Sequence, residues 1–408
     1  MVDLSIVKPR YKIKGGLACA VTSGVLASAG LGLAPTASAS CASFFGIGNS
    51  ADCTSTLFSV AFAIGDGASA HADGVFGASF AIGTGASAIT SGALTLASAV
   101  GNIVTAGAQG LFGVALSVGG SDNKVQAGTS ASVVTLAANF FGSNNTVAAQ
   151  GGLSNRAINF GGDNNTVTTQ GSAFNFARNI LGSNNKVTTT GGYGNAAQNV
   201  LGNGNTVAQE GGVLSEATNL LGNSNTVTTT GGYGNVARNR FGDNNIVTTQ
   251  GGYADLASNL LGTGNTVTSR GGFFNGARSI GGNSNTLTVG GPGSNLNLVL
   301  NVGGDINTIN AGGPGNLNAG FNFFGTNNAV SAGPGPLALA GSVLQDGQNV
   351  TKTNPGIAIN NFRVGGAALT SGQTSTVPKA PAGPVSKISV GGRNTANAAG
   401  ATTGSNKK

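Results

Sequence analysis

The chain has 408 residues, of which 72 are glycine, and only 8% are charged. Glycine is therefore far more frequent, and charge far scarcer, than in an average globular protein. Because proline is scarce and glycine follows no three-residue period, a collagen is excluded, and a hydrophobic fraction of 39% argues against a disordered chain. A single histidine and 12 carboxylates argue against a conventional enzyme.

The N-terminal segment has the features of an export signal. Basic residues between positions 8 and 14 precede a run of small apolar residues, and Ala37-Ser38-Ala39 follows. This order predicts a signal peptide over residues 1–39, cleaved before Ser40. A transmembrane anchor is the alternative, but the run is too weakly apolar to favour it. We therefore expect a secreted or cell-surface protein whose mature chain has no transmembrane span.

The basic charge of the chain lies at its two ends. Without residues 1–39, the chain keeps 15 of the 19 basic and 11 of the 12 acidic residues, and the last 38 residues contain bases but no acid. Residues 371–408 are also rich in Gly, Ser, Thr and Asn, which predicts a disordered basic tail. The body is close to neutral, so nucleic-acid binding is not expected.

Two cysteines remain after the signal peptide, Cys41 and Cys53. In an oxidising exterior, the simplest interpretation is one disulfide that closes a small loop. A metal site is the alternative, but no histidine or carboxylate cluster surrounds these cysteines, and we expect no cofactor. The sequence thus predicts an N-terminal cap over residues 40–56.

A 20-residue repeat organises residues 120–331. Segments such as GSNNTV (142–147) and GDNNTV (162–167) recur at this spacing, and period-two alternation between Gly-rich turns indicates strands. We predict an all-β fold, a parallel β-solenoid of 20-residue coils with two short strands each. Less regular coils with an 18-residue spacing are expected over 57–119, and a closing segment over 332–370.

Identical residues recur at matching positions of the coils. Valines from Val147 onward and alanines from Ala157 onward are predicted to point inward. Since coils stack about 4.8 Å apart, asparagines in one column can hydrogen-bond along the stack and satisfy buried amides. The predicted ladder is Asn145, Asn165, Asn185, Asn205, Asn225, Asn245, Asn265 and Asn285.

The repeats resemble those of known families. GSNNTVAAQ (142–150) is similar to the repeat of curlin-type fibre subunits, which implies a solenoid that assembles into extracellular fibres. Residues 63–92 resemble the head repeats of trimeric autotransporter adhesins. The signal peptide and the Gly/Asn-rich composition are similar to those of secreted repeat proteins of mycobacteria.

An apolar column stands two residues before the repeated glycine. If the following residues, such as Phe141 and Leu181, point inward, this column faces solvent and is a candidate self-association or envelope-contact surface. The alternative is a corner that buries both residues. Arg240 interrupts the column, whose apolar members are Phe140, Phe160, Ile180, Val200, Leu220, Leu260 and Ile280.

We therefore expect a non-catalytic structural or adhesive protein that acts by repetitive display and can self-associate. Envelope or host-surface glycans or proteins are the other expected partners. Two alternatives stay open. An ice-binding solenoid would need unbroken T-x-T rows such as Thr166/Thr168, but Lys186 and Ile246 interrupt them. A carbohydrate-active β-helix enzyme would need clustered acids, whereas Asp163 and Asp243 lie four coils apart.

Overall fold

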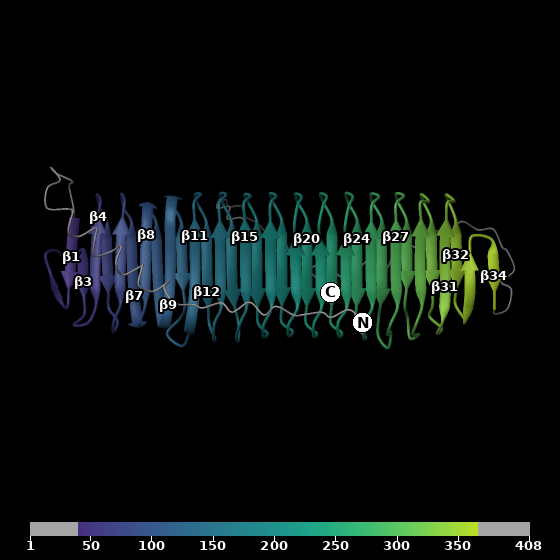
Figure 1. The fold of residues 1–408 in the computed structure, drawn as a ribbon, viewed down its shortest axis with the longest axis horizontal. Coiled ribbons are helices and arrows are strands. Elements are labelled where there is room, and N and C mark those ends of the chain that lie inside the picture. Colours follow the sequence, from purple (N-terminus) through teal and green to yellow (C-terminus); the bar gives the residue numbers. More distant parts are fainter. Residues whose placement is uncertain (1–39, 366–408) are drawn as a thin grey trace, which may run out of the picture. The chain divides into compact units, whose positions relative to one another are not determined.

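The structure is a computed structural model that describes residues 40–365. The predicted signal peptide (1–39) and the predicted basic tail (371–408) lie outside these residues. In the described part, all named elements are β-strands, and about 15 coils follow one another in chain order along a single stack (Figure 1). The predicted parallel β-solenoid is confirmed.

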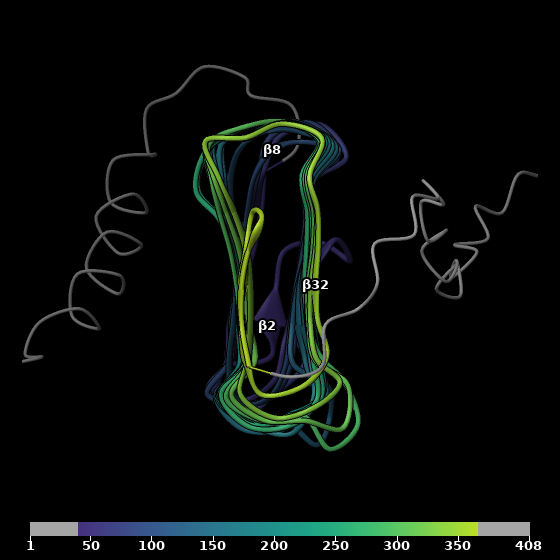
Figure 2. The ribbon, with the colours of Figure 1, turned by 90° about the vertical axis from the view of Figure 1, so that its right-hand side faces the viewer.

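Each coil contributes one strand to each of two parallel sheets, which we name after their inward-pointing residues. Seen along the stack, the coils superimpose into one narrow outline with two long sides (Figure 2). The Val sheet contains β3 (Cys53–Ser55), β5 (Ser69–Ala72), β7 (Ser87–Ala93), the start of β9 (Thr105–Ser121), β10 (Lys124–Ala127), β12 (Thr146–Gln150), β14 (Thr166–Gln170), β16 (Lys186–Thr190), β18 (Thr206–Glu210), β20 (Thr226–Thr230), β22 (Ile246–Gln250), β24 (Thr266–Arg270), β26 (Thr286–Gly290), β28 (Thr308–Ala311), β30 (Ala329–Ala332) and β32 (Asn349–Lys352).

The Ala sheet forms the other long side. It contains β4 (Val60–Ile64), β6 (Ala78–Ile82), β8 (Leu96–Asn102), the end of β9, β11 (Val133–Phe140), β13 (Arg156–Phe160), β15 (Phe176–Ile180), β17 (Ala196–Val200), β19 (Glu216–Asn219), β21 (Val236–Asn239), β23 (Leu256–Asn259), β25 (Gly276–Ile280), β27 (Leu298–Val302), β29 (Ala319–Phe323), β31 (Ala338–Val343) and β33 (Gly356–Ile359).

The register between coils follows the sequence period. Thr146 pairs with Thr166 and Arg156 with Phe176, a shift of 20 residues, whereas β4 and β6 pair with a shift of 18. Strand β9 belongs to both sheets, because its start pairs with β7 and its end with β8. Parallel pairing also continues past residue 331 as far as β33.

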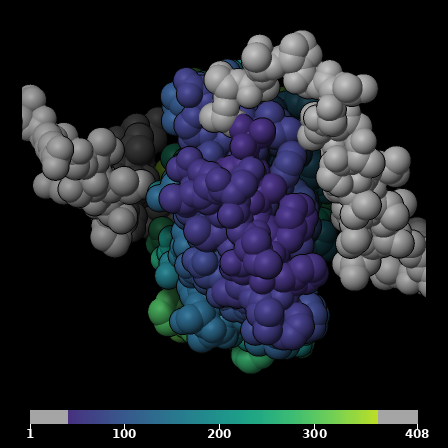
Figure 3. Space-filling view, turned by 90° about the vertical axis from the view of Figure 1, so that its left-hand side faces the viewer, coloured from purple at the N-terminus to yellow at the C-terminus, as the bar shows by residue number. Residues whose placement is uncertain are grey.

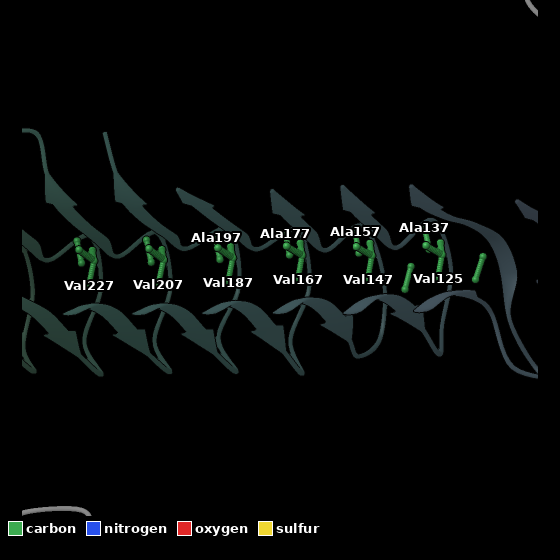
Figure 4. Packing of buried hydrophobic residues seen from close by; sticks show 14 of the residues in the cluster. Val125, Ala137, Val147, Ala157, Val167, Ala177, Val187, Ala197, Val207 and Val227 are labelled. Carbon is green, nitrogen blue, oxygen red and sulfur yellow. The ribbon is translucent and has the colours of Figure 1, made fainter. Parts of the chain in front are cut away.

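The core is a double row of small apolar side chains. Strands β12 and β13 alternate between outward and fully buried positions, as period-two strands must. Val147 of one sheet and Ala157 of the other are both 0% exposed, and the pair recurs in successive coils (Figure 4). A small residue opposite a larger one lets the two sheets approach closely without leaving a cavity.

The N-terminal end is closed by strands that break the parallel pattern. β1 (Ser40–Phe44) pairs antiparallel with β4, and β2 (Ile47–Gly48) folds back onto β1. A disulfide joins Cys41 of β1 to Cys53 of β3, with both cysteines buried. Figure 3 looks onto this end, where the first described residues cover the stack. An antiparallel strand at the end of the stack breaks the parallel pattern that another stack of coils would have to continue.

The C-terminal end is closed in a similar way. β34 (Phe362–Val364) pairs antiparallel with β33. Beside it, Arg363 donates a hydrogen bond from Nη1 to the carbonyl of Thr351 in β32, at 2.9 Å. Lys352 of β32 points inward and donates from Nζ to the carbonyl of Gly365. Charged groups at an edge strand disfavour further strand addition.

Glycines are required where neighbouring coils approach at a corner. Gly182 has φ +133°, and a Cβ there would lie 2.0 Å from the carbonyl oxygen of Gly202 in the next coil. No side chain fits at that distance, and glycine also reaches this conformation without strain. The repeated glycine is therefore set by backbone packing between coils.

Candidate binding surface

The predicted asparagine ladder is present, but its hydrogen bonds differ from those expected. Asn145 accepts the backbone N–H of Asn165 through Oδ1 at 2.9 Å, and its Nδ2 donates to the carbonyl of Gly162 at 2.9 Å. The same pair of bonds recurs from coil to coil. The side chains thus bind mainly the backbone of the next coil, although Asn285 also donates from Nδ2 to Oδ1 of Asn265 at 3.2 Å. The oxygen and the nitrogen of each of these buried amides both have a partner.

Two further ladders add hydrogen bonds between the coils. In one, at the opposite corner, the N–H of Asn175 donates to Oδ1 of Asn155 at 3.0 Å. In the other, within the Ala sheet, Asn159 donates from Nδ2 to Oδ1 of Asn139 at 2.7 Å, so this is the amide-to-amide ladder. The recurring N-x-A-x-N pattern was the sequence signal for both.

Asp255 replaces asparagine in the opposite-corner ladder. It is 1% exposed, and its Oδ1 accepts the N–H of Asn275 at 2.8 Å. Its Oδ2 is buried without a hydrogen-bond partner among the described residues. Burial raises the pKa of Asp255 to about 7, which the hydrogen bonds from Asn275 only partly offset. Asp255 therefore carries a proton more readily than an ordinary aspartate.

The apolar column of the sequence analysis lies on the outside of the Ala sheet. Phe160 ends β13 and is 46% exposed, while Phe140 is partly exposed and its ring centroid lies 5.9 Å from that of Phe160. The following residues do not point inward: Phe141 has φ 62° and is 58% exposed. The column faces outward, as the first alternative of the sequence analysis has it, but the premise of that alternative is wrong, because a left-handed residue turns the second side chain outward as well.

The column is one edge of a larger apolar face. Alternate residues of each Ala-sheet strand point outward, and most of them are apolar, although the middle outward residue is polar or charged from β15 to β25 (Arg178, Gln198, Thr218, Arg238, Ser258 and Arg278). The apolar face comprises Val60, Phe62, Ile64, Phe80, Ile82, Leu96, Val100, Val114, Leu116, Val118, Leu136, Phe140, Ile158, Phe160, Phe176, Ile180, Val200, Leu220, Val236, Leu256, Leu260, Ile280, Leu298, Leu300, Val302, Phe321, Phe323, Leu339 and Val343.

The outer face of the Val sheet is polar by contrast. Its outward positions are mainly threonine, and Thr228 donates to Thr248 of the next coil at 3.3 Å. The residues that interrupt the T-x-T rows, Lys186 and Ile246, are exposed on this face. The rod therefore has two dissimilar sides, one rich in threonine and one apolar.

Large apolar side chains also occupy left-handed positions at the opposite corner. Phe174, Leu214, Phe274 and Leu296 have φ between 55° and 57° and are about half exposed. A bulky residue in this conformation is strained, and glycine or asparagine would adopt it at lower cost. Tyr233 and Tyr253 stack beside this column, with ring centroids 5.0 Å apart.

Arginine is the main charged residue on the apolar face. Arg156, Arg178, Arg238, Arg240 and Arg278 point outward from the Ala sheet. The guanidinium of Arg156 lies 5.8 Å from the ring centroid of Phe176.

Glu216 is the acidic residue of this face, and Arg238 donates to its Oε2 at 2.7 Å. Burial raises the pKa of Glu216, but hydrogen bonds from Arg238 and Thr218 outweigh this effect and lower the pKa overall.

The acids considered for catalysis lie apart and have structural contacts. Asp163 accepts the N–H of Ser143 at 2.7 Å, and Asp243 accepts that of Asn223 at 2.6 Å, each toward the preceding coil. His71 is hydrogen-bonded to Thr54 at 2.9 Å. Over residues 40–365, no group of three or more His, Cys, Asp or Glu side chains gathers as a metal site would require.

Comparisons leave the family of this protein open. No protein-family model matches the chain, and no curated protein matches it in sequence. The likeness to curlin-type and autotransporter repeats therefore stays a prediction from the sequence, whereas the solenoid and its asparagine ladder are properties of the structure. Within the described residues, no helix is long and apolar enough to cross a membrane.

Proposed function

We propose that this protein is an exported, non-catalytic structural protein that adheres to its partner through the apolar face. The observation that supports this proposal is the contrast between the two outer faces. A monomeric protein rarely exposes a contiguous apolar patch of more than a few hundred Å². At 4.8 Å per coil and 3.3 Å per residue, the whole Ala-sheet face, with its polar positions included, measures roughly 70 Å by 16 Å, or on the order of 1,100 Å², and apolar side chains hold most of its outward positions.

Adhesion along such a face would rest on repetition. Each coil presents similar outward side chains, so many weak contacts form at once and their combined strength exceeds that of any one contact. Both ends of the stack carry antiparallel strands. These strands break the parallel pattern at the ends of the Ala sheet, which supports contact along the side of the rod rather than end-to-end growth.

The test is adsorption of the full chain to alkyl-terminated and hydroxyl-terminated monolayers, followed with a quartz crystal microbalance. We expect retention on the alkyl surface. Ile158→Ser combined with Leu300→Ser should increase the off-rate about tenfold, since each removes one apolar side chain from the contact. Thr168→Ser with Thr288→Ser is the matched control on the opposite face and should have no effect. Equal retention of all three proteins would contradict the proposal.

A second measurement tests repetition directly. Deletion of residues 163–182 removes one coil in register, and deletion of 163–222 removes three. Repeat stacks tolerate such deletions because each repeat contacts only its neighbours. The off-rate should rise steeply with each coil removed, whereas a single local binding site would leave it unchanged for deletions elsewhere in the stack.

A further inference from the structure

The charged residues of the apolar face are mostly cations. Five arginines point outward from the apolar face, and the acid among them, Glu216, is paired with Arg238 at 2.7 Å. Acids occupy a corner instead: Asp163 and Asp243 belong to turns at the edge of the stack, where they bind backbone N–H groups. The apolar face is therefore also a cationic face.

The positive charge of this face distinguishes two possible partners, a second copy of the chain and an anionic surface. If a second copy packed face to face, arginines of both copies would enter the same apolar contact with one acid per copy, and burying unpaired charges is costly. An anionic surface offers a counter-charge to every arginine. The charge thus disfavours a dimer and favours an anionic partner.

The spacing of charge and apolar side chains fits a lipid surface. Arginine can lay its aliphatic stem along apolar neighbours while its guanidinium reaches polar headgroups. The guanidinium of Arg156 lies over the ring of Phe176. Arg178 stands in the middle of its strand between the outward residues Phe176 and Ile180, and Arg278 stands beside Ile280. Apolar area combined with cations is the combination that binds proteins to anionic membrane surfaces.

We propose that the apolar face binds a surface of anionic lipids, with the guanidinium groups at headgroup level and the outward Leu, Ile, Val and Phe side chains in the acyl boundary. The inference rests on the proposed function, because it names the partner of the same face. The threonine-rich face of the Val sheet then stays in water.

The chain contains no tryptophan, so the fluorescence of a single introduced tryptophan reports the environment of that one position. Phe160→Trp places it on the apolar face, and Thr146→Trp places it on the opposite face, where Thr146 is exposed. The full chain is mixed with vesicles of phosphatidylcholine alone or with 30% phosphatidylglycerol. We expect a blue shift and quenching by brominated acyl chains for Phe160→Trp with the anionic vesicles, and neither effect for Thr146→Trp.

Flotation with the same vesicles measures the contribution of the arginines. Arg156, Arg178 and Arg278 changed together to Gln should weaken binding about a hundredfold, at about fivefold per cation near an anionic surface. Lys124→Gln with Lys186→Gln, on the opposite face, should leave binding unchanged. Melting followed by circular dichroism verifies that each variant is folded.

Three outcomes would overturn the lipid proposal. If neither tryptophan shifts and the chain does not float, the face does not bind lipid. If the chain is still retained on the alkyl monolayer, the proposed function stands. If it binds neither vesicles nor the alkyl monolayer, both the lipid proposal and the proposed function are refuted. A blue shift of Phe160→Trp that grows with protein concentration in the absence of vesicles would identify a second copy as the occupant. Equal binding to both vesicle types would refute the role of the arginines.

Discussion

The coils before residue 119 and the regular coils after residue 142 follow the same path with different corners. In the early coils the corner residue is Ala68 or Ala86, and its N–H bonds within its own turn, to Gly65 and Gly83. In the regular coils the corner residue is asparagine, and its N–H bonds to the asparagine of the preceding coil. Val104 is the last corner residue before the asparagines begin, and Asn123 is the first asparagine at this corner.

The difference shows that the asparagine ladder is not needed to form a coil. It is a connection between coils, because both hydrogen bonds of each side chain reach a neighbour. Alanine corners rely on burial and backbone ladders alone. The stability of a repeat stack is the sum of the stability of each single repeat and of the contacts between neighbouring repeats. The corner asparagine strengthens the contacts between neighbouring coils.

The corner glycine is common to both regions, so its loss should be equally severe in each. Gly83→Ala and Gly182→Ala would each place a Cβ 2.0 Å from a carbonyl of the next coil. We expect a loss of about 4 kcal/mol or more in the free energy of unfolding, measured by chemical denaturation. Gly211→Ala, with φ +63° and no atom within 4 Å, is the control and should cost about 1 kcal/mol. Comparable losses for all three would show that the close approach is unimportant.

Loss of a corner amide should be costly only in the regular region. Asn205→Ala removes the acceptor of the Asn225 N–H, at 2.9 Å, and the donor to the Gly222 carbonyl, at 2.8 Å. Two buried groups are left unpaired, and we expect a loss of about 3 kcal/mol. Ala86→Gly at the equivalent corner should cost about 1 kcal/mol. The comparison between regions fails if the two changes have the same effect in thermal melts.

Asp255 makes one rung of the opposite-corner ladder sensitive to pH. Its pKa is raised to about 7, above the ordinary value near 4. The folded state therefore holds the proton more tightly than the unfolded state. This contribution is complete below about pH 4 and is lost as the pH rises through 7. Asp255→Asn should stabilise the chain by up to about 4 kcal/mol at pH 8, since each of the roughly three pKa units is worth about 1.4 kcal/mol, and by little at pH 4. A pH-independent difference in melting temperature would refute this assignment.

The ion pair on the apolar face should matter least. Glu216 and Arg238 connect adjacent coils at 2.7 Å, but their side chains are 30% and 38% exposed. Glu216→Gln should reduce the free energy of unfolding by less than about 1 kcal/mol, and added salt should diminish the difference. An effect as large as that of Asn205→Ala would mean that surface charge, rather than the corner amides, connects the coils.

The sequence alone determined the solenoid, its coil length and its inward columns. This was possible because each coil contacts the next, so every contact in the stack recurs as a 20-residue period that can be read directly. Val147, Ala157 and Asn145 are buried where the pattern predicted. The hydrogen-bond partners of the asparagine ladder were not predictable from the sequence. Asn145 bonds to backbone atoms of the next coil, and the backbone conformation at the corner decides where those atoms lie.

Only the tertiary structure decided how the outside is arranged. Period-two alternation could not place Phe141, because its left-handed backbone interrupts the alternation and turns the side chain outward. Nor could one column reveal the apolar face, which exists because 18-, 20- and 22-residue coils come into register. Alternation within one strand decides which residues are buried. The composition of an outer face depends on many coils and on the register in which they stack.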